Sequence, residues 1–282
     1  MTTPTQKLAD HYADEHLPLR LREALVAEGL NPDQLTLDEL APIDQLHVGG
    51  RKASRELADQ AGFQPGEKVL DLGCGTGGSS RLLEAEYGVQ VVGVDITPPF
   101  IEVAHWLSQA TGLDARSEFI CCDAQQLPLE DQQFDAVWSQ HTLMNLPDLE
   151  RGLKEIQRVL KPGGRLLLHE VFQGDNTEPL DYPVPWSEEA THSYLKTPEQ
   201  LALLLQEAGF EPLFQQEVTE EALNWRRKHT ERETRGQTQI LTPQLIFGPR
   251  FLQMGKNLVN NLASGKLRLF QAGWRKLDTP TG

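Results

Sequence analysis

The chain has 282 residues, of which 39% are hydrophobic and 24% are charged, proportions that are typical of a globular protein with a buried core. Its 41 Asp and Glu residues outnumber its 26 Lys and Arg residues, which gives a formal net charge of −15. Because such a surface repels polyanions, we expect neither nucleic acid nor an anionic membrane as a partner.

The first 60 residues predict a helical N-terminal extension. LRLREALVAEG, PDQLTLDEL and RKASRELADQAG have helical spacing, whereas DQLHVGG (44–50) is too rich in glycine for a helix interior and predicts a lid-like loop. We find neither the apolar core of a signal peptide nor a run of 18 apolar residues. We therefore expect a cytoplasmic protein.

Strand and helix patterns alternate in the remainder of the chain. Strands are predicted at 69–73, 89–95, 117–123, 134–140, 165–171, 211–218 and 266–276. This alternation predicts a Rossmann-like α/β fold, with a seven-stranded, mostly parallel sheet and helices on both faces. We expect the core domain over 61–218, a helical insertion over 219–265, and the last strand with a tail over 266–282.

Local signals refine these expectations. Thr97-Pro98 predicts a helix start with an N-cap hydroxyl, and Thr197 with Gln200 predicts a capping box. RRKHTERETR (226–235) mixes charges of both signs and predicts an exposed helix face. Cys121 and Cys122 adjoin each other in a predicted core strand, so we expect buried thiols that form neither a disulfide nor a metal site.

VLDLGCGTGGSS, residues 69–80, joins the first core strand to the next helix and is suited to a cofactor. Its glycines fit the dinucleotide fingerprint of NAD enzymes and also the cofactor loop of methyltransferases. Asp71 would repel a pyrophosphate but attract the ammonium group of S-adenosylmethionine. It therefore favours S-adenosylmethionine, with an NAD-dependent dehydrogenase as the alternative.

Two further acidic residues follow at the ends of the next two predicted strands. Asp95 is placed to accept hydrogen bonds from ribose hydroxyls. Asp123 could accept one from the adenine amine, with Ala124 leaving room for the ring. Because the ends of parallel strands meet at one edge of a sheet, we expect Asp71, Asp95 and Asp123 to line one crevice.

Several longer segments resemble a known family. VLDLGCGTGG, the acid of VVGVD, CDAQQLP followed by FDAVWSQH, and LKPGGRLLLHEV resemble the class I S-adenosylmethionine-dependent methyltransferases. DQLHVGGRKAS, SQHTLMN, YPVPWSEE and the C-terminal NLVNNLASGKLRLFQAGWRK are similar to the sarcosine/dimethylglycine N-methyltransferase group, which completes glycine betaine. The resemblance implies that the cofactor is bound by Asp71, Gly73, Gly75, Gly77, Asp95, Ile96, Asp123, Ala124 and Gln140.

Candidate acceptor residues surround the end of the fourth strand. His141 and Asn145 are the catalytic candidates there, with Met144 beside them, and His47 is a third in the lid-like loop. His169, at the end of the fifth predicted strand, is expected on the same face. A phenol or alcohol acceptor needs a base such as histidine, whereas a tertiary amine product has no proton left to lose.

Three further side chains are candidates for the substrate pocket. Tyr182 and Trp186, in the proline-rich YPVPW, could form an aromatic wall for a cation. Arg51 could pair with a substrate carboxylate.

The sequence therefore predicts an enzyme that methylates a small molecule, with N-methylation of sarcosine or dimethylglycine as the leading hypothesis. An O- or C-methyltransferase acting on another metabolite, and a cofactor-binding scaffold without catalysis, stay open. The oligomeric state, monomer or homodimer, is not determined by the sequence.

Overall fold

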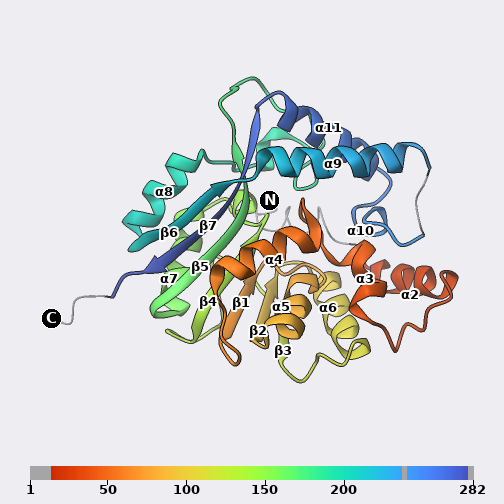
Figure 1. The fold of residues 1–282 in the computed structure, drawn as a ribbon, viewed down its shortest axis with the longest axis horizontal. Helices are drawn as coiled ribbons and strands as arrows, with labels where there is room; N and C mark the ends of the chain where they lie inside the picture. The colour runs from red at the N-terminus through yellow and green to blue at the C-terminus, as the bar shows by residue number, and fades with distance from the viewer. Residues whose placement is uncertain (1–13, 237–239, 279–282) are drawn as a thin grey trace, which may run out of the picture.

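The computed structural model describes residues 14–236 and 240–278. Within them, one sheet has the order β3-β2-β1-β4-β5-β7-β6, and β7 runs antiparallel to both of its neighbours while the other strands run parallel. The predicted fold class is thereby confirmed (Figure 1). The strands are β1 (Lys68–Leu72), β2 (Gln90–Asp95), β3 (Ser117–Cys121), β4 (Phe134–Gln140), β5 (Leu160–Gln173), β6 (Phe210–Glu217) and β7 (Leu267–Lys276).

Helices cover both faces of this sheet. Val69 of β1 and Ala136 of β4 pack against α4 and α5, whereas the next residues, Leu70 and Val137, pack with α7 and α8 on the other face, because side chains alternate along a strand. The helices are α2 (Leu17–Ala27), α3 (Leu37–Asp44), α4 (Gly50–Ala61), α5 (Gly78–Tyr87), α6 (Pro98–Ala110), α7 (Leu149–Val159), α8 (Pro198–Glu207), α9 (Thr219–Thr234), α10 (Gln244–Phe247) and α11 (Phe251–Ala263), with 3₁₀ turns η1 (Leu143–Asn145) and η2 (Ala190–His192).

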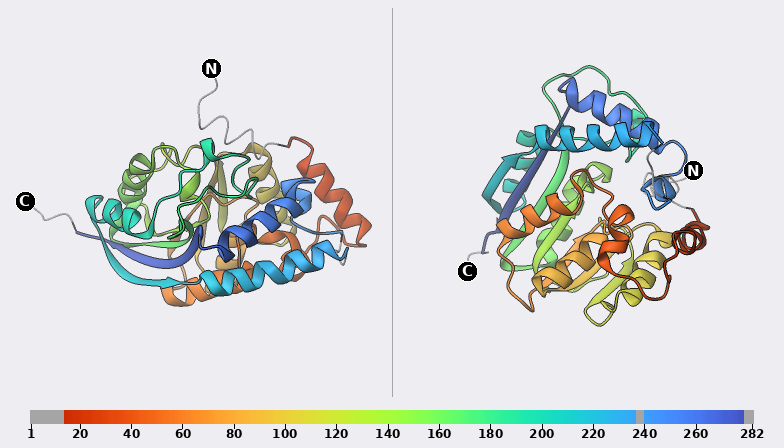
Figure 2. Two further views of the ribbon diagram at one scale, coloured as in Figure 1. Left: turned by 90° about the horizontal axis from the view of Figure 1, so that it is seen from above. Right: turned by 45° about the vertical axis from the view of Figure 1, so that its right-hand side comes forward.

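The helices between β6 and β7 lie over the carboxyl edge of the sheet. Because β6 is parallel to the core strands and β7 is antiparallel, this segment leaves and re-enters the sheet at that edge. α9 and α11 pack side by side there, as Figures 1 and 2 show. α10 instead joins α2, α3 and α6 in a separate apolar cluster. In the parts of the chain that the structure describes, no helix is long and apolar enough to cross a membrane.

Several predicted boundaries need correction. β3 ends at Cys121, so Asp123 lies in the turn that follows. β5 continues to Gln173 because its second half pairs with β7, so His169 lies inside the strand. The helix expected for PDQLTLDEL begins only at Leu37, where Thr36 and Glu39 form a capping box. Residues 1–13 of the predicted extension and 279–282 of the predicted tail lie outside the described residues.

Local predictions had mixed outcomes. Thr197 and Gln200 form the expected capping box. Thr97 does precede α6, but its side chain makes no capping bond; its N–H donates to the Asp95 carboxylate at 2.9 Å. Arg226, expected on an exposed face, is buried against Gly255 of α11 and pairs with Glu233.

The cysteines also differ from expectation. All three are free thiols, and Cys74 is buried, but Cys121 is exposed and Cys122 is only half-buried. β3 is an edge strand of the sheet. It ends at Cys121, so Cys122 lies beyond the strand.

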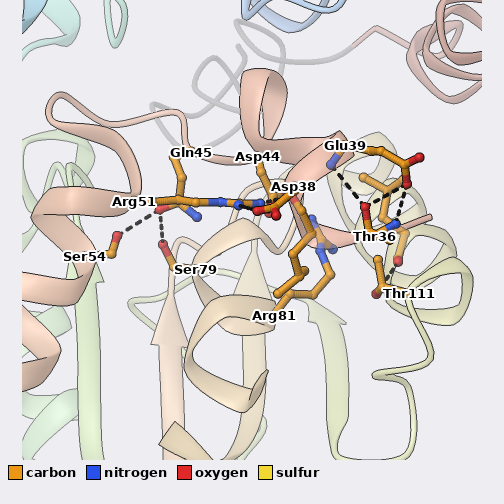
Figure 3. Close-up of polar contacts among 12 residues, drawn as sticks. Thr36, Asp38, Glu39, Asp44, Gln45, Arg51, Ser54, Ser79, Arg81 and Thr111 are labelled. Atoms are coloured by element: carbon orange, nitrogen blue, oxygen red, sulfur yellow. Dashed lines mark hydrogen bonds and ion pairs between the residues drawn. The ribbon is translucent and has the colours of Figure 1, made fainter. Parts of the chain in front are cut away.

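A buried ion pair joins the N-terminal helices to the core. Arg81 of α5 is fully buried and pairs with Asp44 at the end of α3, as Figure 3 shows. It also donates to the carbonyl oxygen of Thr76, at 2.8 Å. The two helices approach so closely that a Cβ on Gly78 would lie 1.5 Å from the Asp44 carbonyl oxygen.

We predict that Asp44→Ala lowers the free energy of unfolding by about 3–5 kcal/mol, because it leaves the Arg81 charge buried without its carboxylate. Arg55→Ala is the control, since it breaks a more exposed pair with Glu86 and should cost no more than about 1 kcal/mol. Urea denaturation of the two variants measures the difference. Equal losses would contradict a special role for the buried pair.

Candidate functional site

A large pocket opens at the carboxyl edge of the sheet. It encloses about 1160 Å³, counting the part that opens to solvent, and its floor is formed by the ends of β1, β2 and β4 and by the turn after β3. The predicted cofactor residues that line it are Asp71, Gly73, Gly75, Asp95, Ile96, Asp123, Ala124 and Gln140.

The glycine loop has the backbone that a ligand-binding turn requires. Gly73 and Gly75 have φ values of +74° and +54°, in the left-handed region that favours glycine. A Cβ on Gly73 would lie 2.2 Å from the Thr142 hydroxyl oxygen. Gly77 is a correction, because it does not line the pocket; it precedes α5 and leaves room for Arg81 and the neighbouring helix.

The acidic side chains are held in place by hydrogen bonds. The Ser80 hydroxyl donates to Asp71 at 2.6 Å, and burial raises the pKa of Asp71 to about 7. The N–H groups of Gly75 and Thr97 donate to the two oxygens of Asp95, at 3.0 and 2.9 Å, and burial raises the pKa of Asp95 too. These carboxylates are therefore oriented before any ligand binds.

The charge of the lining fits a cationic ligand. Four carboxyl groups line the pocket, those of Asp44, Asp71, Asp95 and Asp123, and among the described residues no Lys or Arg does. A pyrophosphate would meet repulsion here, whereas a sulfonium and an ammonium group would neutralise the carboxylates. This acidic lining therefore fits S-adenosylmethionine better than NAD.

Gln140 connects the pocket floor with the 45–49 loop, which links α3 to α4. Its Oε1 accepts hydrogen bonds from Trp138 Nε1 (2.9 Å) and from the Ser79 hydroxyl (2.6 Å). An indole N–H can only donate, so this contact fixes the amide orientation and directs Nε2 to His47 Nε2 at 3.2 Å. Gln45 makes a parallel link, accepting from Ser54 and Ser79 (Figure 3).

Three histidines meet beside the pocket. The rings of His141 and His169 are stacked at 5.2 Å, and His47 lies 6.0 Å from His141 and 5.4 Å from His169. Burial lowers the pKa of His47 to about 3 and that of His169 to about 4, and holds the pKa of His141 well below its usual value. All three imidazoles are therefore neutral near pH 7. His47 and His141 line the pocket.

The turn that carries His141 is strained and firmly held. His141 has a φ of +54°, a conformation that is costly for any residue with a Cβ. Its N–H donates to the His169 carbonyl oxygen at 2.9 Å. The buried Glu170 carboxylate accepts from Ser139 Oγ (2.7 Å) and from the N–H of Thr142 (3.0 Å). β5 thus positions the turn that follows β4, a role of Glu170 that no sequence motif suggested.

The residues predicted to surround the methyl acceptor are only partly brought together. Met144, Asn145 and Trp186 line the pocket, but Arg51 and Tyr182 do not. Arg51 pairs with Asp38 (3.1 Å) and Asp44 (3.7 Å), because α4 begins beside the end of α3. Tyr182 packs in the apolar cluster around α9 and α11 instead.

Sequence reasoning missed much of the apolar wall. These side chains come from five separate segments, and only their shared hydrophobicity could have suggested them. Examples from these five segments are Leu46, Phe100, Leu146, Pro147, Pro185 and Phe247.

Comparison with known proteins assigns the central segment to a family. Residues 70–168 match the family model of a methyltransferase domain, which confirms the predicted resemblance. The chain is 31% identical over 168 residues to "Methyltransferase GfsG" of Streptomyces halstedii, an alignment that covers 59% of this chain and 58% of that protein. Other relatives are named as phosphoethanolamine N-, tocopherol O- and sterol C-methyltransferases, of which the chain spans 35% to 47%.

Solved structures confirm the fold over nearly the whole chain. The "[4+2]-Cyclase SpnF" superposes with a TM-score of 0.72 at 24% identity, covering 99% of this chain and 98% of that one. A protein from Galdieria sulphuraria, provisionally named a sarcosine dimethylglycine methyltransferase, has a TM-score of 0.67 at 21% identity, covering 81% and 86%. At these identities the likeness shows the fold alone.

We predict that His169→Gln makes the stability of the chain less dependent on pH. Because burial lowers the His169 pKa from 6.5 to about 4, acid protonates the unfolded chain first. The contribution of this group to wild-type stability therefore falls as the pH drops from 6.5 towards 4, by up to about 1.4 kcal/mol per unit. Urea denaturation at pH 7, 6 and 5 should show a shallower slope for the variant. Equal slopes would mean that His169 binds protons equally in both states.

Proposed function

We propose that this chain, which carries a methyltransferase domain of class I type over residues 70–168, transfers the methyl group of S-adenosylmethionine to a small molecule. The observation that carries the proposal is the convergence of a glycine loop with the carboxyl groups of Asp71, Asp95 and Asp123 in a pocket that no described Lys or Arg lines. Its free cysteines are compatible with the reducing cytoplasm in which we place it.

The chain's own groups would bind and orient the two reactants. Asp95 would accept hydrogen bonds from the ribose hydroxyls, and Asp123 would accept one from the adenine amine. Asp71 would face the ammonium group. When bound, S-adenosylmethionine supplies a methyl carbon on a sulfonium; the acceptor gives the electron pair of the new bond, and sulfur keeps the pair of the broken one. Catalysis then depends on alignment and on excluding water.

His141 is the candidate for handling the acceptor's proton. Its ring is neutral near pH 7, lines the pocket, and is held by the strained turn after β4. A neutral imidazole within reach of the acceptor can take a proton as the new bond forms.

N-methylation of sarcosine or dimethylglycine, towards glycine betaine, is the finer proposal. It rests on the sequence resemblance, and the fold shared with the Galdieria sulphuraria protein supports it. Against it, a carboxylate acceptor needs a cation, and Arg51 already pairs with Asp38 and Asp44. The pocket therefore favours the alternative, O- or C-methylation of another metabolite.

Mass-spectrometric detection of transfer from methyl-labelled S-adenosylmethionine tests the proposal. Glycine, sarcosine, dimethylglycine and a small-metabolite extract are offered in separate reactions. Label in any small molecule supports methyl transfer, and label in betaine establishes the amine acceptor. If the protein binds the cofactor but labels nothing, as a scaffold or a cyclase would, the proposal fails.

We predict that Asp95→Asn weakens S-adenosylhomocysteine binding by about 10- to 100-fold, because charged hydrogen bonds contribute about 1.5–3 kcal/mol. Asp114→Asn, an exposed acid outside the pocket, should leave the affinity unchanged. Titration calorimetry measures both. Unchanged affinity in Asp95→Asn would remove this carboxylate from the cofactor site.

We also predict that His141→Gln lowers turnover by about 10²- to 10⁴-fold if the acceptor must lose a proton. Glutamine keeps a polar side chain but cannot take the proton. His105→Gln, an exposed histidine outside the pocket, is the matched control. A loss below tenfold would reduce His141 to a positioning role.

A further inference from the structure

We propose that the methyl acceptor is an uncharged, largely apolar molecule that carries a hydroxyl group. The inference rests on the proposed function and names the substrate class of the same pocket. It depends on how charge, apolar surface and unpaired polar atoms are distributed along the pocket wall.

The pocket has two chemically different ends. The charged side chains belong to the cofactor end, where Asp71 lies in β1, Asp95 ends β2, Asp123 follows β3 and Asp44 closes α3. Another part of the lining, which we call the acceptor end, is built from η1 with the two residues after it and from the proline-rich loop, whose Met144 and Trp186 pack in one apolar cluster. Its described lining is Met144, Asn145, Leu146, Pro147, Pro185 and Trp186.

No charged residue of either sign is among the described residues that line the acceptor end. A carboxylate or phosphate placed there would lose its hydration without gaining a cation, at a cost of several kcal/mol. Arg51 cannot turn to it without breaking its contacts to Asp38 and Asp44. The acceptor end therefore selects an uncharged ligand whose surface is mostly apolar.

Two buried polar atoms mark where the ligand's hydrogen-bonding group lies. His141 Nε2 and Asn145 Oδ1 have no partner among the described residues, and both residues line the pocket. The Asn145 amide nitrogen donates to the His141 carbonyl oxygen at 3.5 Å, which orients the amide so that Oδ1 is left over.

This pair calls for a donor on the ligand. Asn145 Oδ1 can only accept a hydrogen bond, and His141 Nε2 accepts one in its Nδ1–H tautomer. Leaving such atoms unpaired inside a closed site costs about 1–3 kcal/mol each. A hydroxyl group donates its one proton to either of these two atoms, whereas an ether, a ketone or the unprotonated nitrogen of dimethylglycine has no proton to donate.

Binding of matched small molecules tests the inference without relying on turnover. Titration calorimetry, in the presence of S-adenosylhomocysteine, compares 4-propylphenol with 4-propylanisole, which lacks the donor, and with 4-propylbenzoate, which is charged. We expect the phenol to bind at least about 10-fold more tightly than either. Equal binding of all three, or tighter binding of the benzoate or of dimethylglycine, would overturn the inference.

Two variants separate the contributions. Asn145→Ala should weaken the phenol about 10-fold and leave the anisole unchanged. Met144→Lys places a cation at the acceptor end and should improve benzoate binding at least about 10-fold, whereas Met144→Leu, its apolar control, should not. If Asn145→Ala does not fold, the comparison of Met144→Lys with Met144→Leu tests the inference. Benzoate binding that Met144→Lys does not improve would contradict the charge argument.

The outcome also separates this inference from the proposed function. If the wild-type protein does not bind S-adenosylhomocysteine, both the proposed function and the inference are contradicted. If it binds the cofactor product but prefers carboxylate ligands, methyl transfer stands and only the acceptor class is wrong.

Discussion

The buried Arg81 guanidinium is the contact on which the geometry of the pocket depends. It joins three parts of the chain: the glycine loop through the Thr76 carbonyl oxygen, α6 through the Ala104 carbonyl oxygen and Ser108, and the end of α3 through Asp44. A charge this deeply buried is tolerated only with its partners in place, so the three parts are fixed together. Asp44 itself lines the pocket, and the loop that follows it carries His47. This pair therefore fixes the residue from which the 45–49 loop begins.

A second constraint acts from the neighbouring strand. Consecutive residues of β5 support the turn after β4, because the His169 carbonyl oxygen accepts from His141 N–H and the Glu170 carboxylate accepts from Thr142 N–H. Glu170 is buried, and burial raises its pKa to about 7. The His169 ring also bonds to the Val48 carbonyl oxygen at 2.9 Å. One strand thereby positions both His141 and the 45–49 loop, which explains how a left-handed residue is held at this site.

The separation of charge along the pocket gives the two ends different selectivity. Acids at the strand ends favour a cationic cofactor, and in our proposal the uncharged lining contributed by η1 and the proline-rich loop disfavours an anionic acceptor. Relatives of this domain are named for N-, O- and C-methylation, and a protein of the same fold is named a cyclase. One fold therefore serves several acceptor chemistries, so the acceptor has to be argued from the site and not from the fold.

The sequence by itself determined the fold class, the glycine loop and the acids near the strand ends. The fold class follows from short-range periodicity, and the loop and acids follow from their fixed positions at the ends of neighbouring parallel strands. It did not place Arg51, Tyr182 or Gly77 correctly, because their positions depend on how α3, α6, α9 and α11 pack around them. It also gave no sign of Phe247 or Glu170. Their roles arise only when the segment after β6 returns to the carboxyl edge and β5 packs beside β4. Such juxtapositions depend on tertiary packing, which no local pattern in the chain encodes.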